Sequence, residues 1–301
     1  MQTLPELNWL ARREAHQERV DGLLADHRER RSRGTAHPVE DFLFDYYSFR
    51  PAQLRQWHPG AGVGLGGAAA ADYLDIRDYV RTTTGVTLDV DAVLATRGAT
   101  VRWVLDLLQR TAARPGFFGC FGLHEWAMVY RQQATDVRHP DWPLRLPADG
   151  VAGVVEERGV RCGHFDAFRF FTPAARPLNL LQPTRADQPA LEQPGCLHAN
   201  MDLYKFAYKL SPLISSELVV DCFVLARDIR QLDMRASPYD LTGLGLEPVR
   251  IETPEGRAAY AAAQRGFTER SRPLRHVLIE RLEGLVAQLE PAAWRGSGGL
   301  P

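Results

Sequence analysis

The sequence predicts a mainly α-helical globular protein with few short strands, on three observations. Apolar residues recur at helical spacing over several long stretches of the 301-residue chain. Hydrophobic residues make up 45% and charged residues 24%, which is ordinary globular composition for a chain long enough to bury a core. No internal repeat is present, and irregular stretches rich in proline or glycine separate the helical ones.

We divide the chain into three parts: an N-terminal helix within residues 1–36, a single mainly helical catalytic domain over residues 37–290, and a tail at residues 291–301. Residues 5–33 are expected to form one helix with a thin apolar edge and a basic end. An acidic and aromatic stretch follows. On a helix that starts at Pro38, Asp41 and Asp45 would lie one turn apart, as would Phe42 and Tyr46.

Residues 60–67 contain a formal G-x-G-x-x-G pattern at Gly62, Gly64 and Gly67. The dinucleotide-binding fingerprint needs a buried strand before the glycines and a helix after them. The preceding residues, Gln53 to Pro59, do not read as a buried strand. We therefore expect a flexible loop that binds no dinucleotide.

Most of the remaining chain is expected to be helical. The stretch 160–171 reads as a short strand or the start of a helix, whereas 136–149 and 172–196 read as loops. The last helical stretch is expected to be one helix or two, broken near Pro273. The expected helices cover residues 72–83, 89–96, 100–111, 123–131, 148–158, 196–210 and 255–290.

One helix, from Pro212 to about Met234, organises the expected fold. Ser211 is a suitable N-cap residue and proline suits the first helical turn. A single apolar stripe of helical period predicts its buried face: Leu218, Cys222, Leu225, Ile229 and Leu232. Glu217, Asp221 and Asp228 form a second row beside it, which is either a solvated flank or the wall of a site.

Charge and cysteine content restrict the classes of function. The formal net charge is −1, which argues against a strong general grip on nucleic-acid phosphates. The four cysteines include no C-x-x-C pair, so neither a disulfide framework nor a zinc knuckle is indicated. No signal peptide or apolar run of membrane-spanning length occurs, so we expect a cytoplasmic protein without a membrane partner. The sequence does not indicate an oligomeric state.

The stretch from Cys162 to Phe171 places ionisable groups at His164, Asp166 and Arg169 among phenylalanines. A carboxylate buried among aromatic rings needs a partner or a chemical role, because burial of an unpaired charge is costly. Asp166 is therefore a candidate catalytic residue, and a structural Asp166–Arg169 pair is the alternative.

A second candidate is the pair His124 and Glu125, although the H-E-x-x-H zinc pattern is absent. His198 and Asp202 lie one helical turn apart, and Asp233 lies at the end of the organising helix. We expect no cofactor; if a metal is bound, the candidate ligands are His198, Asp202, Asp221 and Asp228. The E-x-x-H pattern of two-metal helical proteins is absent.

Four stretches resemble an actinobacterial family of proteins labelled 3-methyladenine DNA glycosylase. They are HPVEDFLFDYYSFRPAQLRQWHPG, FFGCFGLHEWAMVYR, HFDAFRFF and SELVVDCFVLARDIRQLDMRASPYDL, and the resemblance spans roughly residues 37–265. It implies a hydrolase of base excision repair that acts on an alkylated base in DNA. The helix-hairpin-helix motif of well-understood glycosylases is absent from this sequence.

The leading hypothesis is an enzyme that hydrolyses the N-glycosidic bond of a purine-like base, with a nucleobase, a nucleoside or damaged DNA as partner. Such a reaction needs a carboxylate, a proton donor and aromatic faces that hold the base. The candidate catalytic residues are Asp166, Glu125, His124 and His164, and the candidate substrate-binding residues are Tyr47, Phe165, Phe168, Arg169, Arg235 and Tyr239. The alternatives are a metal-dependent helical oxidase or hydrolase that uses the His and Asp clusters, and a non-catalytic ligand-binding protein.

Overall fold

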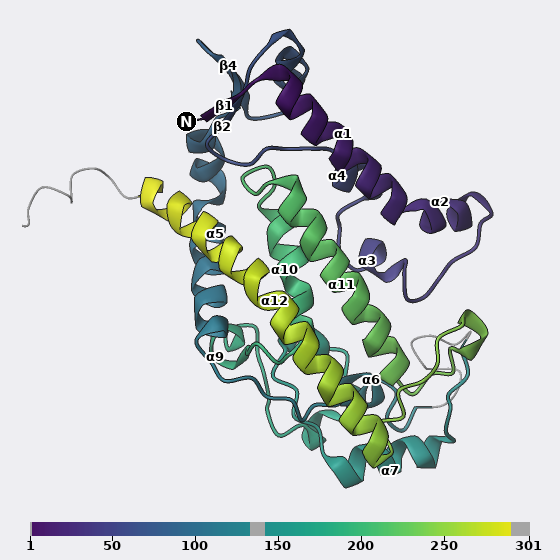
Figure 1. The fold of residues 1–301 in the computed structure, drawn as a ribbon. Coiled ribbons are helices and arrows are strands. Elements are labelled where there is room, and N and C mark those ends of the chain that lie inside the picture. The colour runs from purple at the N-terminus through teal and green to yellow at the C-terminus, as the bar shows by residue number, and fades with distance from the viewer. Residues whose placement is uncertain (1, 133–141, 290–301) are drawn as a thin grey trace, which may run out of the picture. The chain divides into compact units, whose positions relative to one another are not determined.

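A computed structural model describes residues 2–132 and 142–289 and confirms the mainly helical fold (Figure 1). The predicted tail at residues 291–301 and part of the predicted loop at 136–149 lie outside the described residues. The chain forms two compact units. Among the described residues, unit 1 comprises residues 2–108, 204–223 and 274–289, and unit 2 comprises residues 109–132, 142–203 and 224–273.

The N-terminal stretch forms two helices where one was predicted. Helix α1 covers Glu6–Leu23 and α2 covers Ala25–Ser32. Leu24 separates them with φ −105° and ψ 2°, outside the helical region, and its side chain is only 1% exposed. The short helices α3 (Phe42–Asp45) and α4 (Pro51–Arg55) follow.

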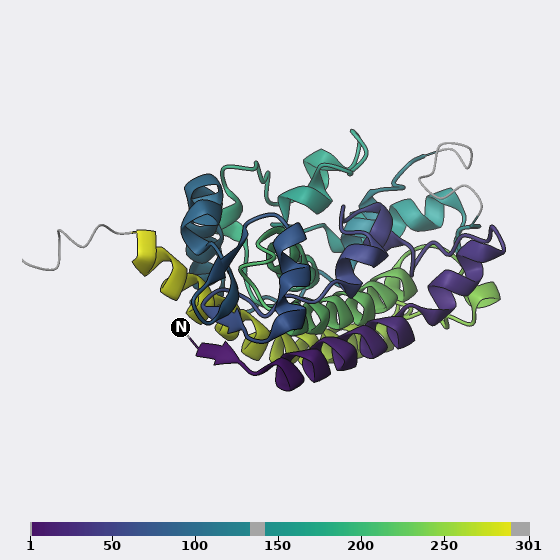
Figure 2. The ribbon, with the colours of Figure 1, turned by 90° about the horizontal axis from the view of Figure 1, so that it is seen from above.

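Unit 1 contains a four-stranded sheet in the order β1-β2-β4-β3. Its strands are β1 (Gln2–Leu4), β2 (Val63–Leu65), β3 (Tyr79–Thr82) and β4 (Gly85–Leu88). Strand β1 pairs with β2 in parallel, and the other two pairings are antiparallel. Strand β1 leads directly into α1, as both ribbon views show (Figures 1 and 2). The Trp9 indole of α1 donates to the Gly66 carbonyl at 2.8 Å and so joins the helix to the sheet.

The sheet corrects two predictions. The glycine-rich stretch was expected to be a loop, yet its centre is β2. The predicted helix at 72–83 is instead the 3-10 helix η1 (Ala68–Asp75) followed by β3. At Gly85 a Cβ would lie 2.0 Å from the Leu65 carbonyl oxygen, and φ is +146°. Only glycine allows this close pairing of β4 with β2.

The long helices are more continuous than predicted. The two stretches expected at 89–96 and 100–111 form one helix, α5 (Val90–Ala112). Helix α12 (Pro254–Leu289) runs through Pro273 without a break. Proline lacks an amide hydrogen, so it removes one hydrogen bond of the helix, but the neighbouring turns continue. Helices α7 (Ala148–Arg158) and α10 (Leu197–Lys209) agree with the predicted ranges.

The other short elements lie mostly in unit 2. They are the helices α6 (Leu123–Ala127), α8 (Phe165–Phe168) and α9 (Gln188–Leu191) and the 3-10 helices η2 (Arg176–Leu178) and η3 (Thr242–Leu244). The stretch 160–171 contains one turn of helix at Phe165–Phe168, and Val160 forms an isolated β-bridge.

The organising helix is α11 (Ser216–Ala236), which begins four residues later than predicted. The predicted N-cap Ser211 and the following Pro212 lie before the helix. The Leu213 carbonyl next to them accepts from the Ala61 amide at 2.9 Å and forms no helical hydrogen bond. The predicted stripe is confirmed: Leu218, Cys222, Leu225, Ile229 and Leu232 are all at most 8% exposed.

The row of carboxylates beside the stripe forms ion pairs at the surface. Glu217 and Asp221 pair with Arg12 and Arg19 at 2.7 Å in each case. Asp228 pairs with Arg270 at 2.6 Å. All three carboxylates are between 28% and 43% exposed, so each pair contributes only modestly to stability. This row is a solvated flank.

In the described part of the chain, no helix is both long enough and apolar enough to span a membrane.

We expect Leu225→Ala to lower the free energy of unfolding by about 2–5 kcal/mol, because Leu225 is only 2% exposed in a packed core. Leu180, which is 75% exposed, is the matched control, and Leu180→Ala is expected to change stability by less than about 0.5 kcal/mol. Urea unfolding of both variants measures the difference. Equal stabilities of the two variants would contradict the buried stripe.

Candidate metal centre

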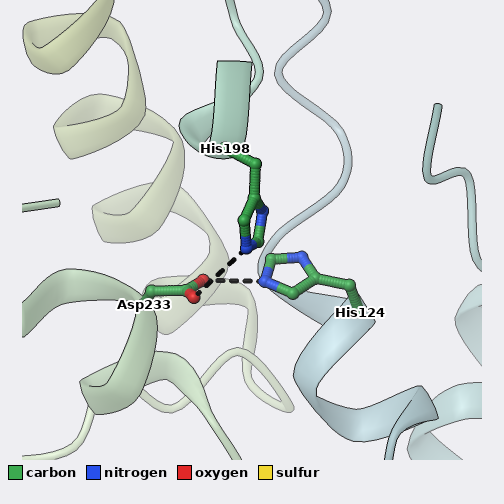
Figure 3. Close-up of side chains that lie close together, drawn as sticks. All are labelled: His124, His198 and Asp233. Carbon is green, nitrogen blue, oxygen red and sulfur yellow. Dashed lines mark hydrogen bonds and ion pairs between the residues drawn. The ribbon is translucent and has the colours of Figure 1, made fainter. Parts of the chain in front are cut away.

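Three helices of unit 2 bring His124, His198 and Asp233 together. His124 lies in α6, His198 near the start of α10 and Asp233 near the end of α11, and the three side chains point toward one another (Figure 3). His124 Nε2 and Asp233 Oδ1 are 2.8 Å apart, and His198 Nε2 is 4.0 Å from Asp233 Oδ2. The two imidazole rings meet edge to face with 4.5 Å between their centroids. We call these residues triad A.

Burial and charge set the protonation of triad A in different ways. Burial would raise the pKa of Asp233, but the neighbouring His124, His198 and Arg230 hold it far below its usual range. Burial would lower the pKa of His124, yet the Asp233 carboxylate outweighs it and raises that pKa. Burial, assisted by the charge of His124, holds the pKa of His198 well below its usual value. The triad thus combines an ionised carboxylate with one neutral imidazole.

A second group, triad B, consists of His164, Glu192 and Asp202. His164 precedes α8, Glu192 follows α9 and Asp202 lies in α10. His164 Nε2 is 3.3 Å from Asp202 Oδ2 and 3.5 Å from Glu192 Oε1. All three residues are at most 3% exposed.

Neighbouring groups orient triad B. The Ala167 amide donates to His164 Nδ1 at 3.3 Å, so Nδ1 is an acceptor, and in a neutral ring Nε2 carries the proton that faces the two carboxylates. The side-chain amide of Gln188 donates from Nε2 to Glu192 Oε1 at 2.5 Å. A metal-ligating histidine usually donates from its other ring nitrogen, so a metal ion at triad B would require the His164 proton to move to Nδ1 and the contact with the Ala167 amide to be lost.

The two triads adjoin. The rings of His164 and His198 are stacked, with 5.1 Å between their centroids and 24° between their planes. His198 and Asp202 also lie one helical turn apart on α10, so one helix supplies a residue to each triad. The six side chains therefore form one largely buried cluster with two subsites.

Arg230 and Glu125 support triad A from α11 and α6. Arg230 Nη1 lies 3.1 Å from Glu125 Oε1 and 3.4 Å from Asp233 Oδ2. Both residues are at most 5% exposed. The guanidinium therefore fixes the orientation of Asp233, and Glu125 acts through Arg230.

The donor chemistry of both triads suits a transition-metal ion. Within each triad, one ligand atom per residue lies within 4.8 Å of the others. Imidazole nitrogen combined with carboxylate oxygen suits iron, manganese or zinc. Two histidines with one carboxylate, as in triad A, form the ligand set of many non-haem iron oxygenases.

A pocket of about 420 Å³ opens onto the cluster within unit 2. Its wall includes His124, His164, Glu192 and His198, so ligands of both triads face the same space. Three of the four cysteines also line it: Cys120, Cys162 and Cys196. Burial raises the pKa of each thiol, to about 12 for Cys162, so the thiols stay neutral.

The predicted catalytic residues are distributed unevenly around this pocket. His124 and His164 line the pocket. Glu125 does not line it but accepts a hydrogen bond from Arg230. Asp166 is not among the lining residues. Its carboxylate is 3.6 Å from Arg169 and 3.5 Å from Arg185, both in unit 2.

The predicted substrate-binding residues make other contacts. Phe168 packs on Phe171 with 5.2 Å between ring centroids, and Arg185 lies over the Phe165 ring. Arg169 lies over the Phe170 ring, and Arg235 Nε donates to the Glu247 carbonyl at 2.7 Å. Tyr239 is buried in unit 2, and Tyr47 is buried in unit 1 against Tyr204.

Of the four metal ligands considered from the sequence, His198 and Asp202 belong to the cluster, in different triads. Asp221 and Asp228 belong instead to the surface ion pairs with Arg19 and Arg270. No sequence pattern marked Glu192 as a ligand, because it lies in a proline-rich stretch without periodicity. Asp233 could have been selected from the sequence, since it lies four residues after Ile229 on the buried side of α11.

Comparisons with known proteins add no relative: no family model, no curated protein and no solved structure matches the chain.

We expect Gly195→Ala to destabilise the pocket wall by about 1–3 kcal/mol, because a Cβ at Gly195 would lie 2.6 Å from the Phe117 carbonyl oxygen. Gly153 of α7 is the contrasting position, because a Cβ there would point into open space as far as the described residues extend. Gly153→Ala is therefore expected to stabilise the protein by about 0.5–1 kcal/mol. Urea unfolding distinguishes the two effects. A Gly195→Ala protein as stable as wild type would show that the close approach is absent.

Proposed function

We propose that the protein is a metal-dependent enzyme with a two-metal centre, and specifically a non-haem iron oxidase or oxygenase. The observation that carries this proposal is the pair of largely buried, adjoining triads on one pocket. The buried carboxylates and imidazoles pair with one another in this structure, and the same nitrogen and oxygen atoms are ligands that a metal ion takes.

The donor set favours iron. Three imidazole nitrogens make a pure magnesium or calcium site unfavourable, because these ions prefer oxygen ligands. The ligand atoms of both triads include no sulfur, which disfavours a soft ion such as Cu(I). Triad A has the two-histidine, one-carboxylate composition of non-haem iron enzymes, and the carboxylate-rich triad B suits iron or manganese.

Open coordination positions favour catalysis over a purely structural role. The six protein side chains supply about three ligand atoms to each ion, whereas iron takes up to about six ligands. Since ligands of both triads line the pocket, a substrate or a small oxidant that enters it could take the remaining positions. Bound iron would supply the electrons that reduce dioxygen.

The chain's own residues would position the reacting groups. Arg230 holds Asp233 through its guanidinium, and Glu125 holds Arg230 in turn. The Gln188 side chain orients Glu192 in triad B. Such outer contacts keep the ligands in place before the metal arrives, which lowers the cost of binding it.

The metal content of the protein tests the proposal. Purified without chelator and reconstituted anaerobically with Fe(II), the wild type is expected to bind about two ions per chain, one per triad. His198→Ala and Asp202→Asn are each expected to lose about one ion or to weaken its binding roughly 10- to 100-fold. Asp228→Asn, which removes a surface carboxylate of α11, is the matched control and should retain both ions.

Exposure of the Fe(II)-loaded protein to air then tests the reaction class. Fe(III) absorbance bands are expected to form in the wild type and in Asp228→Asn, and to be lost in His198→Ala. Wild-type protein that binds no transition metal would refute the two-metal centre. Preferential binding of zinc would redirect the proposal from oxidation to metal-assisted hydrolysis.

The N-glycosidic bond hydrolase implied by the family resemblance is a separate proposal. It rests on Asp166, whose carboxylate is 12% exposed and lies between Arg169 and Arg185. Two guanidinium groups lie beside this carboxylate, which is the group that would stabilise an oxocarbenium ion.

We expect Asp166→Asn, which keeps the shape and removes the charge, to lower any release of alkylated purine from DNA or nucleosides about 100-fold or more. Melting temperature is measured on the same preparation. A variant that melts early but keeps full turnover would assign Asp166 a structural role in the pair with Arg169.

A further inference from the structure

We propose that the pocket binds a monoanionic carboxylic acid with a mainly apolar body, and that Arg161 binds its carboxylate. This inference rests on the proposed function, because it identifies the substrate class of the same pocket. It is carried by an arginine on the pocket wall, the rigidity of its surroundings and the apolar character of the remaining lining.

Arg161 is available for a ligand. It lines the pocket and is exposed, and its guanidinium carbon lies 4.6 Å from the centroid of the Phe117 ring. Within residues 2–132 and 142–289, no carboxylate forms an ion pair with it. Stacking on an aromatic ring leaves the edge of the guanidinium, with its N–H donors, open to an anion.

The other arginine on the wall is already engaged. Arg114 Nη1 donates to the Glu192 carbonyl at 2.8 Å, and Nη2 donates to the Pro189 carbonyl at 2.7 Å. These bonds fix the segment that presents Glu192 to triad B. Arg114 is therefore a structural residue, and Arg161 is the arginine of the wall that can recognise a substrate.

The backbone that carries Arg161 is fixed on both sides. Asn179, which is 3% exposed, accepts from the Cys162 amide at 2.7 Å and donates to the Cys162 carbonyl at 2.9 Å. Val160 forms a parallel bridge with Asn179. Arg161 thus lies between two residues whose backbones are held by the segment around Asn179, which reduces the entropy lost when it binds an anion.

Phe117, the ring beneath Arg161, is held equally well. Gln193 Oε1 accepts from the Phe117 amide at 2.8 Å and from the Gly195 amide at 2.7 Å. Gly195 allows this approach because it has no side chain there. The stacked pair of Phe117 and Arg161 therefore belongs to a part of the pocket wall whose backbone is held by hydrogen bonds.

The rest of the lining favours an apolar body. Most of the remaining side chains are aliphatic or neutral thiols: Leu181, Ala190, Leu191, Leu197, Cys162 and Cys196. A cavity of about 420 Å³ accommodates a small molecule rather than a macromolecule. Such a ligand would place C–H bonds beside the metal ligands of both triads.

A carboxylate fits better than a phosphate. A single guanidinium matches one carboxylate through two parallel hydrogen bonds. A dianionic phosphate would bring a second negative charge into a pocket that already contains Glu192. One available arginine therefore favours a single negative charge.

Binding of octanoate to the Fe(II)-loaded protein, measured anaerobically by calorimetry, tests the inference. Octanamide and octyl phosphate share the apolar chain and differ in the head group. We expect octanoate to bind more tightly than both, and Arg161→Gln to weaken octanoate binding roughly tenfold to hundredfold. The affinity for octanamide should change little.

Arg158→Gln is the matched control, because Arg158 is exposed in unit 2 and does not line the pocket. Metal content measured on the same samples separates the two proposals. Octanoate binding that depends on Arg161 in a protein without metal would keep this inference and refute the two-metal centre. Octanoate binding that is absent, unchanged in Arg161→Gln or weaker than that of octyl phosphate would overturn the inference.

Discussion

The structure of unit 2 depends on the burial of one carboxylate. Asp233 is fully buried, and isolating an ionised carboxylate from water costs many kcal/mol unless charged or hydrogen-bonding partners replace the lost hydration. One partner comes from a distant part of the chain, His124 at 2.8 Å from α6, and another, Arg230 at 3.4 Å, comes from the preceding turn of α11. α6 and the end of α11 must therefore stay together for Asp233 to remain ionised inside the protein. The Trp126 indole, which donates to the Ala236 carbonyl at 2.9 Å, fastens the same two helices.

Helix α11 shows how the same residue type takes two roles on one element. Glu217, Asp221 and Asp228 lie beside the apolar stripe, remain partly exposed and pair with flexible arginines. Asp233 lies on the buried side, four residues after Ile229, where the helical period calls for an apolar residue. A polar residue in such a position needs partners inside the protein, and His124 and Arg230 supply them for Asp233. The same reasoning applies to His198 and Asp202, two polar residues one turn apart on α10, of which Asp202 is only 2% exposed.

Sequence reasoning therefore succeeded where a local period decides the structure and failed where distant segments meet. The stripe of α11 and the ranges of α7 and α10 could be predicted because each depends on side chains within a few turns. The sheet could not, since its strands have three or four residues and Gln2–Leu4 pairs with Val63–Leu65, far along the chain. The same holds for the cluster: His124, His164 and His198 could each be selected as candidates, but no spacing relates them to one another. Glu192 had no period and no neighbouring motif, and only the fold brings it to His164.

The pocket also keeps hard and soft donor groups apart. Three thiols line it, yet the ligand atoms that converge in the two triads are nitrogen and oxygen only. Burial raises the pKa of Cys120, Cys162 and Cys196, and a neutral thiol is a poor metal ligand because the thiolate is the form that binds. Neutral thiols behave as small apolar groups, so they extend the apolar lining up to the edge of the cluster. The resulting arrangement places a charged N/O centre at the edge of an apolar cavity, with Arg161 as a second charged group on its wall. A ligand held at both the cluster and Arg161 would have a fixed orientation in the pocket. A fixed orientation is the condition for a selective reaction at one carbon of the ligand's apolar chain.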